Sequence, residues 1–202
     1  MSTDKPFVKV CGLSTAQDVD VAVAHGADAV GFVLTESVRE IPVQRAAELV
    51  KAVPAGIATV AVFRGEDIGK VLERAGRAGV GWVQLHGQRT AADVAAAHEA
   101  GFKVIRAVRR NDSEEQFADW GEELLLIDAS VPGSGESWDY AAVKDLAAGR
   151  RWLVAGGLSA QNVAEALDAS GAFGADVSSG VESARGVKDP KLIASFIEAA
   201  KS

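Results

Sequence analysis

The sequence alternates between short apolar runs and amphipathic stretches, and this alternation constrains the fold more than any other feature. Eight runs have the length and the branched or aliphatic composition of strands. Each is followed by a turn and then by apolar residues at helical spacing. Strand starts lie about 21 to 30 residues apart. The runs cover residues 7–12, 29–34, 57–63, 80–86, 102–107, 123–128, 153–155 and 175–177.

Helices are expected to follow every strand. The spacing of apolar residues predicts them over 15–25, 42–50, 68–75, 91–100, 113–120, 139–148 and 160–170, with a last one after residue 189. Thr90 and Ser159 are predicted to be N-caps, and Asp189 caps the last helix with Pro190 in its first position.

Alternating strands and helices with near-continuous apolar strands indicate a parallel sheet, and eight such units indicate a closed barrel. We therefore expect an α/β chain that folds as a single compact (β/α)₈ TIM barrel over residues 1–202. The competing architecture is a doubly wound open sheet, which normally has fewer strands and a glycine fingerprint after the first strand. Gly12 alone does not supply that fingerprint.

Composition limits the partners that the chain can have. The net charge is −7 with acidic and basic residues interspersed, which argues against a nucleic-acid surface. No apolar run approaches the length of a membrane span, and the first residues lack an apolar signal core. The single cysteine excludes an internal disulfide and a multi-cysteine metal site. We expect a cytoplasmic monomer or homodimer without a membrane or nucleic-acid partner, and without a metal.

The carboxyl ends of the predicted strands carry reactive side chains. In a barrel of this kind, chemistry takes place at the rim formed by these ends. Arg106 is expected there as well. The rim would bring together a thiol, two carboxyl groups, an imidazole and a guanidinium, on Cys11, Asp128, Asp176, His86 and Arg39.

Two turns late in the chain are candidates for a phosphate site. Each follows an apolar strand and is free of bulky side chains, so that several backbone N–H groups are within reach of one anion. The simpler interpretation is that each is only a tight turn. The candidate phosphate-binding residues are Gly156, Gly157, Ser178, Ser179 and Gly180.

Four motifs carry a resemblance to a known family. Lys9-Val-Cys-Gly12, Gln84-Leu-His-Gly87, Ala155-Gly-Gly-Leu158 and Asp176-Val-Ser-Ser-Gly-Val-Glu182 resemble the phosphoribosylanthranilate isomerases of tryptophan biosynthesis, and the resemblance spans essentially the whole chain. It implies a small sugar-phosphate substrate and no cofactor. The implied reaction is an Amadori rearrangement that converts N-(5′-phosphoribosyl)anthranilate to 1-(2-carboxyphenylamino)-1-deoxyribulose 5-phosphate.

The resemblance also implies roles for individual residues. It makes Cys11 the general base, Asp128 the general acid and Arg39 the ligand of the anthranilate carboxylate, with His86 and Asp176 as further substrate contacts. These residue types suit the roles. A carboxyl group backed by apolar residues can hold a proton near neutrality, and a free thiol with a pKa of about 8.5 is easily tuned.

Simpler interpretations of these residues stay open from the sequence. Cys11 could be a small buried hydrophobe, Asp128 a loop cap, Arg39 a solvated charge and His86 a brace for its own loop. Two other functions are also open. One is isomerisation of the histidine-pathway aminoaldose, alone or as a second substrate, against which Cys11 argues because such barrels use two aspartates. The other is sugar-phosphate binding without turnover.

Overall fold

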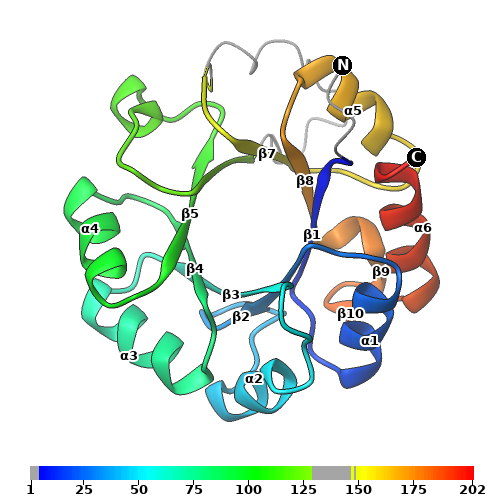
Figure 1. Ribbon diagram of the computed structural model, residues 1–202, viewed down its shortest axis with the longest axis horizontal. Helices are drawn as coiled ribbons and strands as arrows, with labels where there is room; N and C mark the ends of the chain where they lie inside the picture. The colour runs from blue at the N-terminus through cyan, green and yellow to red at the C-terminus, as the bar shows by residue number, and fades with distance from the viewer. Residues whose placement is uncertain (1–4, 129–146, 148) are drawn as a thin grey trace.

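Eight parallel strands close into a barrel, and the helices lie around its outside (Figure 1). This computed structural model describes residues 5–128, 147 and 149–202. The barrel confirms the fold expected from the sequence, and each predicted strand agrees with the observed one within two residues at either end. The strands are β1 (Phe7–Cys11), β2 (Ala29–Val33), β3 (Ala58–Arg64), β4 (Trp82–His86), β5 (Lys103–Arg109), β6 (Leu124–Asp128), β7 (Trp152–Ala155) and β8 (Gly174–Val177).

Strand β8 closes the barrel by pairing with β1. Phe7 lies opposite Gly174 and Lys9 opposite Asp176. A β-carbon at Gly174 would lie 2.0 Å from the carbonyl oxygen of Phe7, so only glycine permits this approach. The pairing makes the first and last strands of the barrel neighbours, and it places Lys9 beside Asp176 inside the barrel.

Four of the six α-helices in the described residues begin where a side chain accepts a hydrogen bond from an N–H group of the first turn, at Thr15, Asp67, Thr90 and Asp189. Thr90 forms a capping box with Asp93, and Asp189 accepts hydrogen bonds from the two N–H groups that follow Pro190, so two of the three predicted caps are confirmed. Helix α6 packs beside α1 and completes the ring (Figure 1). The helices are α1 (Ala16–Ala24), α2 (Val43–Val50), α3 (Ile68–Ala78), α4 (Ala91–Glu99), α5 (Val163–Ser170) and α6 (Pro190–Ala200).

Two predicted helices are wrong in part. Residues 113–120 contain only a short 3₁₀ helix, η1 (Glu114–Phe117), and not an α-helix. Helix α5 begins at Val163 rather than at residue 160, because the Ser159 N–H donates to the side chain of Asn162 and Ser159 is therefore part of a turn. The expected helix over 139–148, apart from residue 147, lies outside the described residues, and so does the segment 133–137.

Arg106 does not lie on the rim, so that expectation is wrong. Its neighbours on β5, Ile105 and Ala107, point into the barrel, and alternation sends Arg106 outward. There its guanidinium donates to the backbone of η1 and pairs with Glu122 at 2.7 Å. The carbonyl groups of residues 116 and 118 accept these hydrogen bonds.

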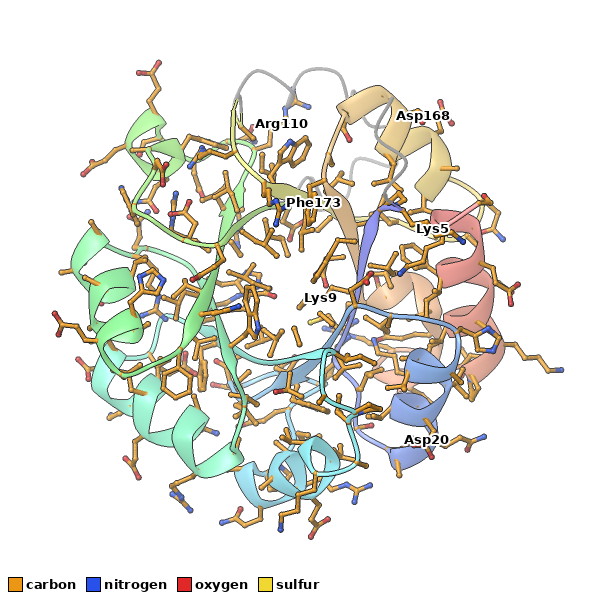
Figure 2. All side chains as sticks on the ribbon, in the orientation of Figure 1. Lys5, Lys9, Asp20, Arg110, Asp168 and Phe173 are labelled. Atoms are coloured by element: carbon orange, nitrogen blue, oxygen red, sulfur yellow. The ribbon has the colours of Figure 1, made fainter. Side chains whose placement is uncertain are left out.

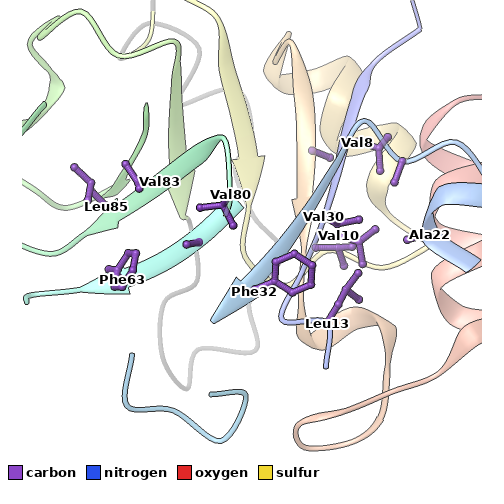
Figure 3. Close-up of a cluster of buried hydrophobic side chains, with 14 of the residues drawn as sticks. Val8, Val10, Leu13, Ala22, Val30, Phe32, Phe63, Val80, Val83 and Leu85 are labelled. Carbon is purple, nitrogen blue, oxygen red and sulfur yellow. The ribbon is translucent and has the colours of Figure 1, made fainter. Parts of the chain in front are cut away.

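Most buried apolar side chains belong to two separate clusters. One cluster lies between the barrel and the helices, and Figure 3 shows part of it, including Val10, Val30 and Phe32. A second cluster fills the lower interior of the barrel, which is the part toward the amino ends of the strands. In the part of the chain that the structure describes, no helix is both long and apolar enough to cross a membrane. The interior cluster contains Ala29, Val60, Ile105, Ala107, Leu124, Leu126, Leu153 and Ala155.

A small hairpin follows β8. After the 3₁₀ helix η3 (Ser179–Val181), strands β9 (Glu182–Ala184) and β10 (Val187–Lys188) pair antiparallel beside the barrel. The hairpin carries Glu182 and Lys188, whose side chains both point back toward the barrel rim, as their contacts show below.

Candidate active site

A cavity of about 510 Å³ opens among the carboxyl ends of the strands, a size typical of small-molecule sites. The structure brings all ten candidate site residues to this one cavity. They are Cys11, Arg39, His86, Asp128, Gly156, Gly157, Asp176, Ser178, Ser179 and Gly180.

Cys11 enters the cavity because of strand alternation. Val8 and Val10 on β1 pack outward against the helices, so Lys9 and Cys11 point inward. The side chain of Cys11 packs with Val33 and Val62 and is 6% exposed. Burial raises the pKa of the Cys11 thiol, while the charges of Lys9 and Lys188 oppose this rise. The surroundings as a whole therefore raise the pKa of the thiol and do not supply the easy ionisation expected from the sequence.

Asp128 ends β6, three strands around the barrel from β1. Its carboxyl group is half-buried and borders the same cavity as Cys11. It also faces Asp176 closely enough for its charge to raise the pKa of that residue, after burial, which is the larger cause. The two groups expected to act as acid and base thus border one cavity from different strands.

His86 is held neutral. Desolvation lowers the pKa of His86 to about 3, and the charges of Arg64, Lys9, Arg109 and Arg89 act in the same direction. Its Nε2 contacts Nε2 of Gln84. A group with this pKa is a weak base at neutral pH, so His86 is suited to hydrogen bonding rather than to proton abstraction.

Arg39 is not a solvated loop charge. Its Nε and Nη2 donate to the two carboxylate oxygens of Glu182 at 2.6 and 2.9 Å, across 143 residues of sequence. Lys188 donates to Glu182 at 2.9 Å and to the hydroxyl of Ser178 at 3.2 Å. Burial alone would raise the pKa of Glu182, but these hydrogen bonds and one from the Gly186 N–H lower it to about 2. The carboxylate therefore fixes the guanidinium at the edge of the cavity.

The two glycine-containing turns lie against each other. Gly156 and Gly157 have φ of 95° and 66°, in the left-handed region that favours glycine. Asn162 braces this turn by donating to the Gly157 carbonyl at 3.0 Å. A β-carbon at Gly180 would lie 1.8 Å from the Leu158 carbonyl oxygen, so the second turn approaches the first as only glycine allows. Gly157 itself has open space where a β-carbon would project.

Several residues at the site were not singled out by the sequence reasoning. Gln84 lies inside the barrel at 1% exposure and borders the cavity, and its Oε1 has no hydrogen-bond partner among the described residues. Arg185 borders the cavity from the β9–β10 hairpin. Lys9, Glu182 and Lys188 stand in the quoted motifs or beside them. A lysine at an inward position of an apolar strand was the one signal that could have drawn attention to Lys9.

Comparison with known proteins agrees with this geometry. The family described as N-(5′phosphoribosyl)anthranilate (PRA) isomerase matches residues 8–199. An N-(5′-phosphoribosyl)anthranilate isomerase from Listeria monocytogenes is 38% identical over 202 residues, which covers 96% of this chain and 98% of the relative.

Solved structures give the same result. TrpF from Jonesia denitrificans superposes with a TM-score of 0.87 at 43% identity, covering 96% of each chain. A phosphoribosyl anthranilate isomerase in complex with reduced 1-(o-carboxyphenylamino)-1-deoxyribulose 5-phosphate superposes with a TM-score of 0.84 at 32% identity, covering 97% of this chain and 98% of the other. The resemblance inferred from the four motifs is confirmed, and the chain belongs to the N-(5′-phosphoribosyl)anthranilate isomerase family.

Proposed function

We propose that Cys11 and Asp128 are the base and the acid with which this chain carries out the reaction of its family. The chain is an isomerase of tryptophan biosynthesis, and it converts N-(5′-phosphoribosyl)anthranilate to 1-(2-carboxyphenylamino)-1-deoxyribulose 5-phosphate. The observation that supports these roles is the shared cavity, which the thiol of β1 and the carboxyl group of β6 border together.

The first step is ring opening. The carboxylic proton of Asp128 passes to the ring oxygen of the ribose, and the bond between C1′ and that oxygen breaks with its electron pair remaining on oxygen. The lone pair of the anthranilate nitrogen forms the C1′=N double bond of an iminium ion. An acid placed at the leaving oxygen is required because an alkoxide is a poor leaving group at neutral pH.

The second step is proton abstraction. The Cys11 thiolate takes the C2′ proton, the released pair forms a C1′=C2′ double bond, and the π pair of C1′=N returns to nitrogen. Return of the Cys11 proton to C1′ and transfer of the C2′ hydroxyl proton to Asp128 give the ketone and restore both side chains. No atom or electron is gained or lost, as an isomerisation requires.

We assign substrate binding to the remaining groups. The N–H groups of Gly157, Ser179 and Gly180 suit the phosphate, since backbone donors at bare turns bind anions well. The guanidinium of Arg39, fixed by Glu182, suits the anthranilate carboxylate. Asp176 and neutral His86 are left as hydrogen-bonding groups for the sugar.

Turnover by Cys11 variants tests the base. We expect Cys11→Ser to lose about 10² to 10⁴ in kcat with KM within a few-fold, because a serine hydroxyl is far less acidic than a thiol. Cys11→Asp should retain part of the activity, since it restores a group that can accept a proton. The spectroscopic loss of phosphoribosylanthranilate measures both. Full activity of Cys11→Ser would assign the base elsewhere, with Asp176 as the next candidate because His86 is a weak base.

A turnover assay with the histidine-pathway aminoaldose decides whether that substrate is also converted. We propose that it is not, because barrels that convert it use two aspartates, and this chain has Cys11 in place of one of them.

We also propose that the enzyme is cytoplasmic, because a lone thiol base works only while it stays reduced. Whether it is a monomer or a homodimer stays a prediction that sedimentation can decide. A solved relative is described as mutually generated monomers of a dimeric enzyme from Thermotoga maritima.

A further inference from the structure

A lysine lies fully buried inside the barrel, next to the proposed base. Lys9 is 0% exposed, and Figure 2 shows it inside the ring of strands, whereas Asp20 and Asp168 lie on the outside. It stands two residues before Cys11 on β1, so both side chains point into the barrel. Its ammonium group pairs with Asp176 of the neighbouring strand β8 at 2.7 Å.

Gly31 has no side chain, and this leaves room for the ammonium group of Lys9 and the thiol of Cys11 to lie close together. Gly31 of β2 lies opposite Cys11 in the barrel register. A β-carbon at Gly31 would lie 3.1 Å from Sγ of Cys11 and 3.3 Å from Nζ of Lys9. Both groups therefore border the one space that glycine leaves open, and a larger residue at position 31 would displace one or both of them.

The ion pair by itself does not account for Lys9. Taking two charges into a protein interior costs several kcal/mol per ion, and replacing such a pair by apolar residues is often neutral or stabilising. The lower interior of this barrel is in fact apolar. Lys9 is the charged exception among the inward residues of β1, and it lies where the negative charge of a Cys11 thiolate would appear.

More positive than negative charges face Cys11. Lys9 faces it from β1, Lys188 from β10 and Arg39 from the segment after β2, while Asp176 is the anion that faces it from β8. Burial raises the pKa of the thiol, and Lys9 is the strongest opposing charge. Desolvation likewise lowers the pKa of Lys9, but Asp176 and Cys11 more than offset this, so Lys9 stays protonated.

We propose that Lys9 is a positioning residue for the base: its buried ammonium lies against Cys11 and stabilises the thiolate that accepts the C2′ proton, while Asp176 holds the ammonium in place. This inference rests on the proposed role of Cys11. The thiol loses its proton to solvent before the substrate reacts, and Lys9 keeps its own proton throughout.

The pH titration of the thiol tests the proposal without turnover. Cys11 is the single cysteine of the chain, so thiolate absorbance or the rate of alkylation by iodoacetamide reports on this residue alone, with Cys11→Ser as the blank. In Lys9→Met the midpoint should rise, so that alkylation below both midpoints is at least about tenfold slower. In Asp176→Asn the midpoint should fall, because an opposing negative charge is removed. A purely structural role for Lys9 would not move the midpoint in opposite directions in the two variants.

A double variant guards against misfolding. Lys9→Met leaves Asp176 buried and unpaired, whereas Lys9→Met with Asp176→Leu removes both charges together and should fold. Its midpoint should also lie above that of the unaltered chain, because Lys9 is the stronger of the two influences on the thiol. An unchanged midpoint in a double variant with unaltered circular dichroism would overturn the proposal.

The outcomes separate this inference from the proposed function. If Cys11→Ser turns over at the full rate, Cys11 is not the base, whatever Lys9 does to the thiol. If Cys11→Ser is inactive and the thiol titrates identically with and without Lys9, the inference alone fails. If both hold, the lower limb of the kcat–pH profile should shift to higher pH in Lys9→Met while KM stays within a few-fold.

Discussion

Strand β6 has two ends with opposite properties. Leu124 begins the strand and is buried among apolar side chains of the lower barrel interior, whereas Asp128 ends it at the cavity. At about 3.3 Å per residue the two lie roughly 13 Å apart along one strand. The difference teaches that each strand carries residues for stability at its amino end and residues for chemistry at its carboxyl end, so the two kinds of residue do not lie in different parts of the sequence.

The rim side of the barrel contains charge pairs. Lys9 with Asp176 and Arg39 with Glu182 are charge pairs with little exposure, and neither pair has both members on one strand. Such pairs position groups well but add little net stability. The apolar end has no such requirement, since Leu124, Ile105 and Leu153 need only fill space. Substitutions at the two ends should therefore give different kinds of defect.

Asp128→Asn should give the largest effect and should spare stability. Asparagine keeps the shape of the side chain but cannot donate a carboxylic proton, so kcat should fall about 10² to 10⁴-fold. The melting temperature should change little, because the group borders a cavity. Asp20→Asn on the exposed face of α1 is the matched control and should keep the full kcat. Turnover close to the unaltered rate in Asp128→Asn would assign ring opening to another group.

Leu124→Ala should give the converse result at the other end of β6. Truncating a buried leucine removes apolar contacts and leaves a cavity, which costs about 2 to 5 kcal/mol of unfolding free energy. Urea denaturation measures this loss. The kcat of the folded fraction should stay within a few-fold. A loss of kcat as large as that in Asp128→Asn would show that the two ends are coupled, and the separation along the strand would not hold.

The sequence predicted the strands and the rim better than it predicted the contacts across the rim. Apolar runs of strand length, each followed by a turn, located β1 to β8, because these patterns are local. Arg39 and Glu182 are 143 residues apart in the sequence, and no sequence pattern near either residue indicates that they pair. Arg106 was misplaced because it stood next to the end of the predicted strand, whereas β5 continues to Arg109 and alternation turns Arg106 outward.

The region after β7 shows the same limit. Ser159 has the residue type of an N-cap, but the Asn162 side chain accepts its N–H and the helix starts one turn later. The roles of the ten cavity residues stay predictions that the turnover of the variants tests. The pKa directions at Cys11 and His86 required the three-dimensional arrangement of charges, which composition does not contain.

Gly157→Val should affect binding more than turnover. A side chain there would project into the space assigned to the phosphate, and loss of hydrogen bonds to a charged group costs about 1.5 to 3 kcal/mol. We expect KM to rise about 10-fold to 100-fold. Gly101→Val is the matched control, because Gly101 also has positive φ, at 86°, and open space around it, but it lies at the end of α4, before β5. If both variants raise KM alike, backbone strain rather than blocked approach is the cause.

His86→Gln should give the smallest effect, which is a change in how the free energy of unfolding depends on pH. The pKa of His86 is lowered to about 3 from an ordinary value of 6.5, so the unfolded chain binds the proton more tightly than the folded one. Its contribution to stability is therefore complete above pH 6.5 and is lost as the pH falls toward 3. Glutamine carries no charge at any pH, and the variant should lack this loss.

The window between about pH 6.5 and 4.5 isolates His86 from Glu182, whose own contribution is lost only below its ordinary pKa of 4.5 as the pH falls toward 2. Because His86 is only partly buried by the surrounding side chains, we expect the difference in unfolding free energy across this window to be about 1 kcal/mol. Urea denaturation at several pH values measures it. Equal slopes for the unaltered chain and His86→Gln would mean that the imidazole gains a proton in the folded state, and the rim would then carry a further positive charge that the phosphate and the carboxylate of the substrate could use.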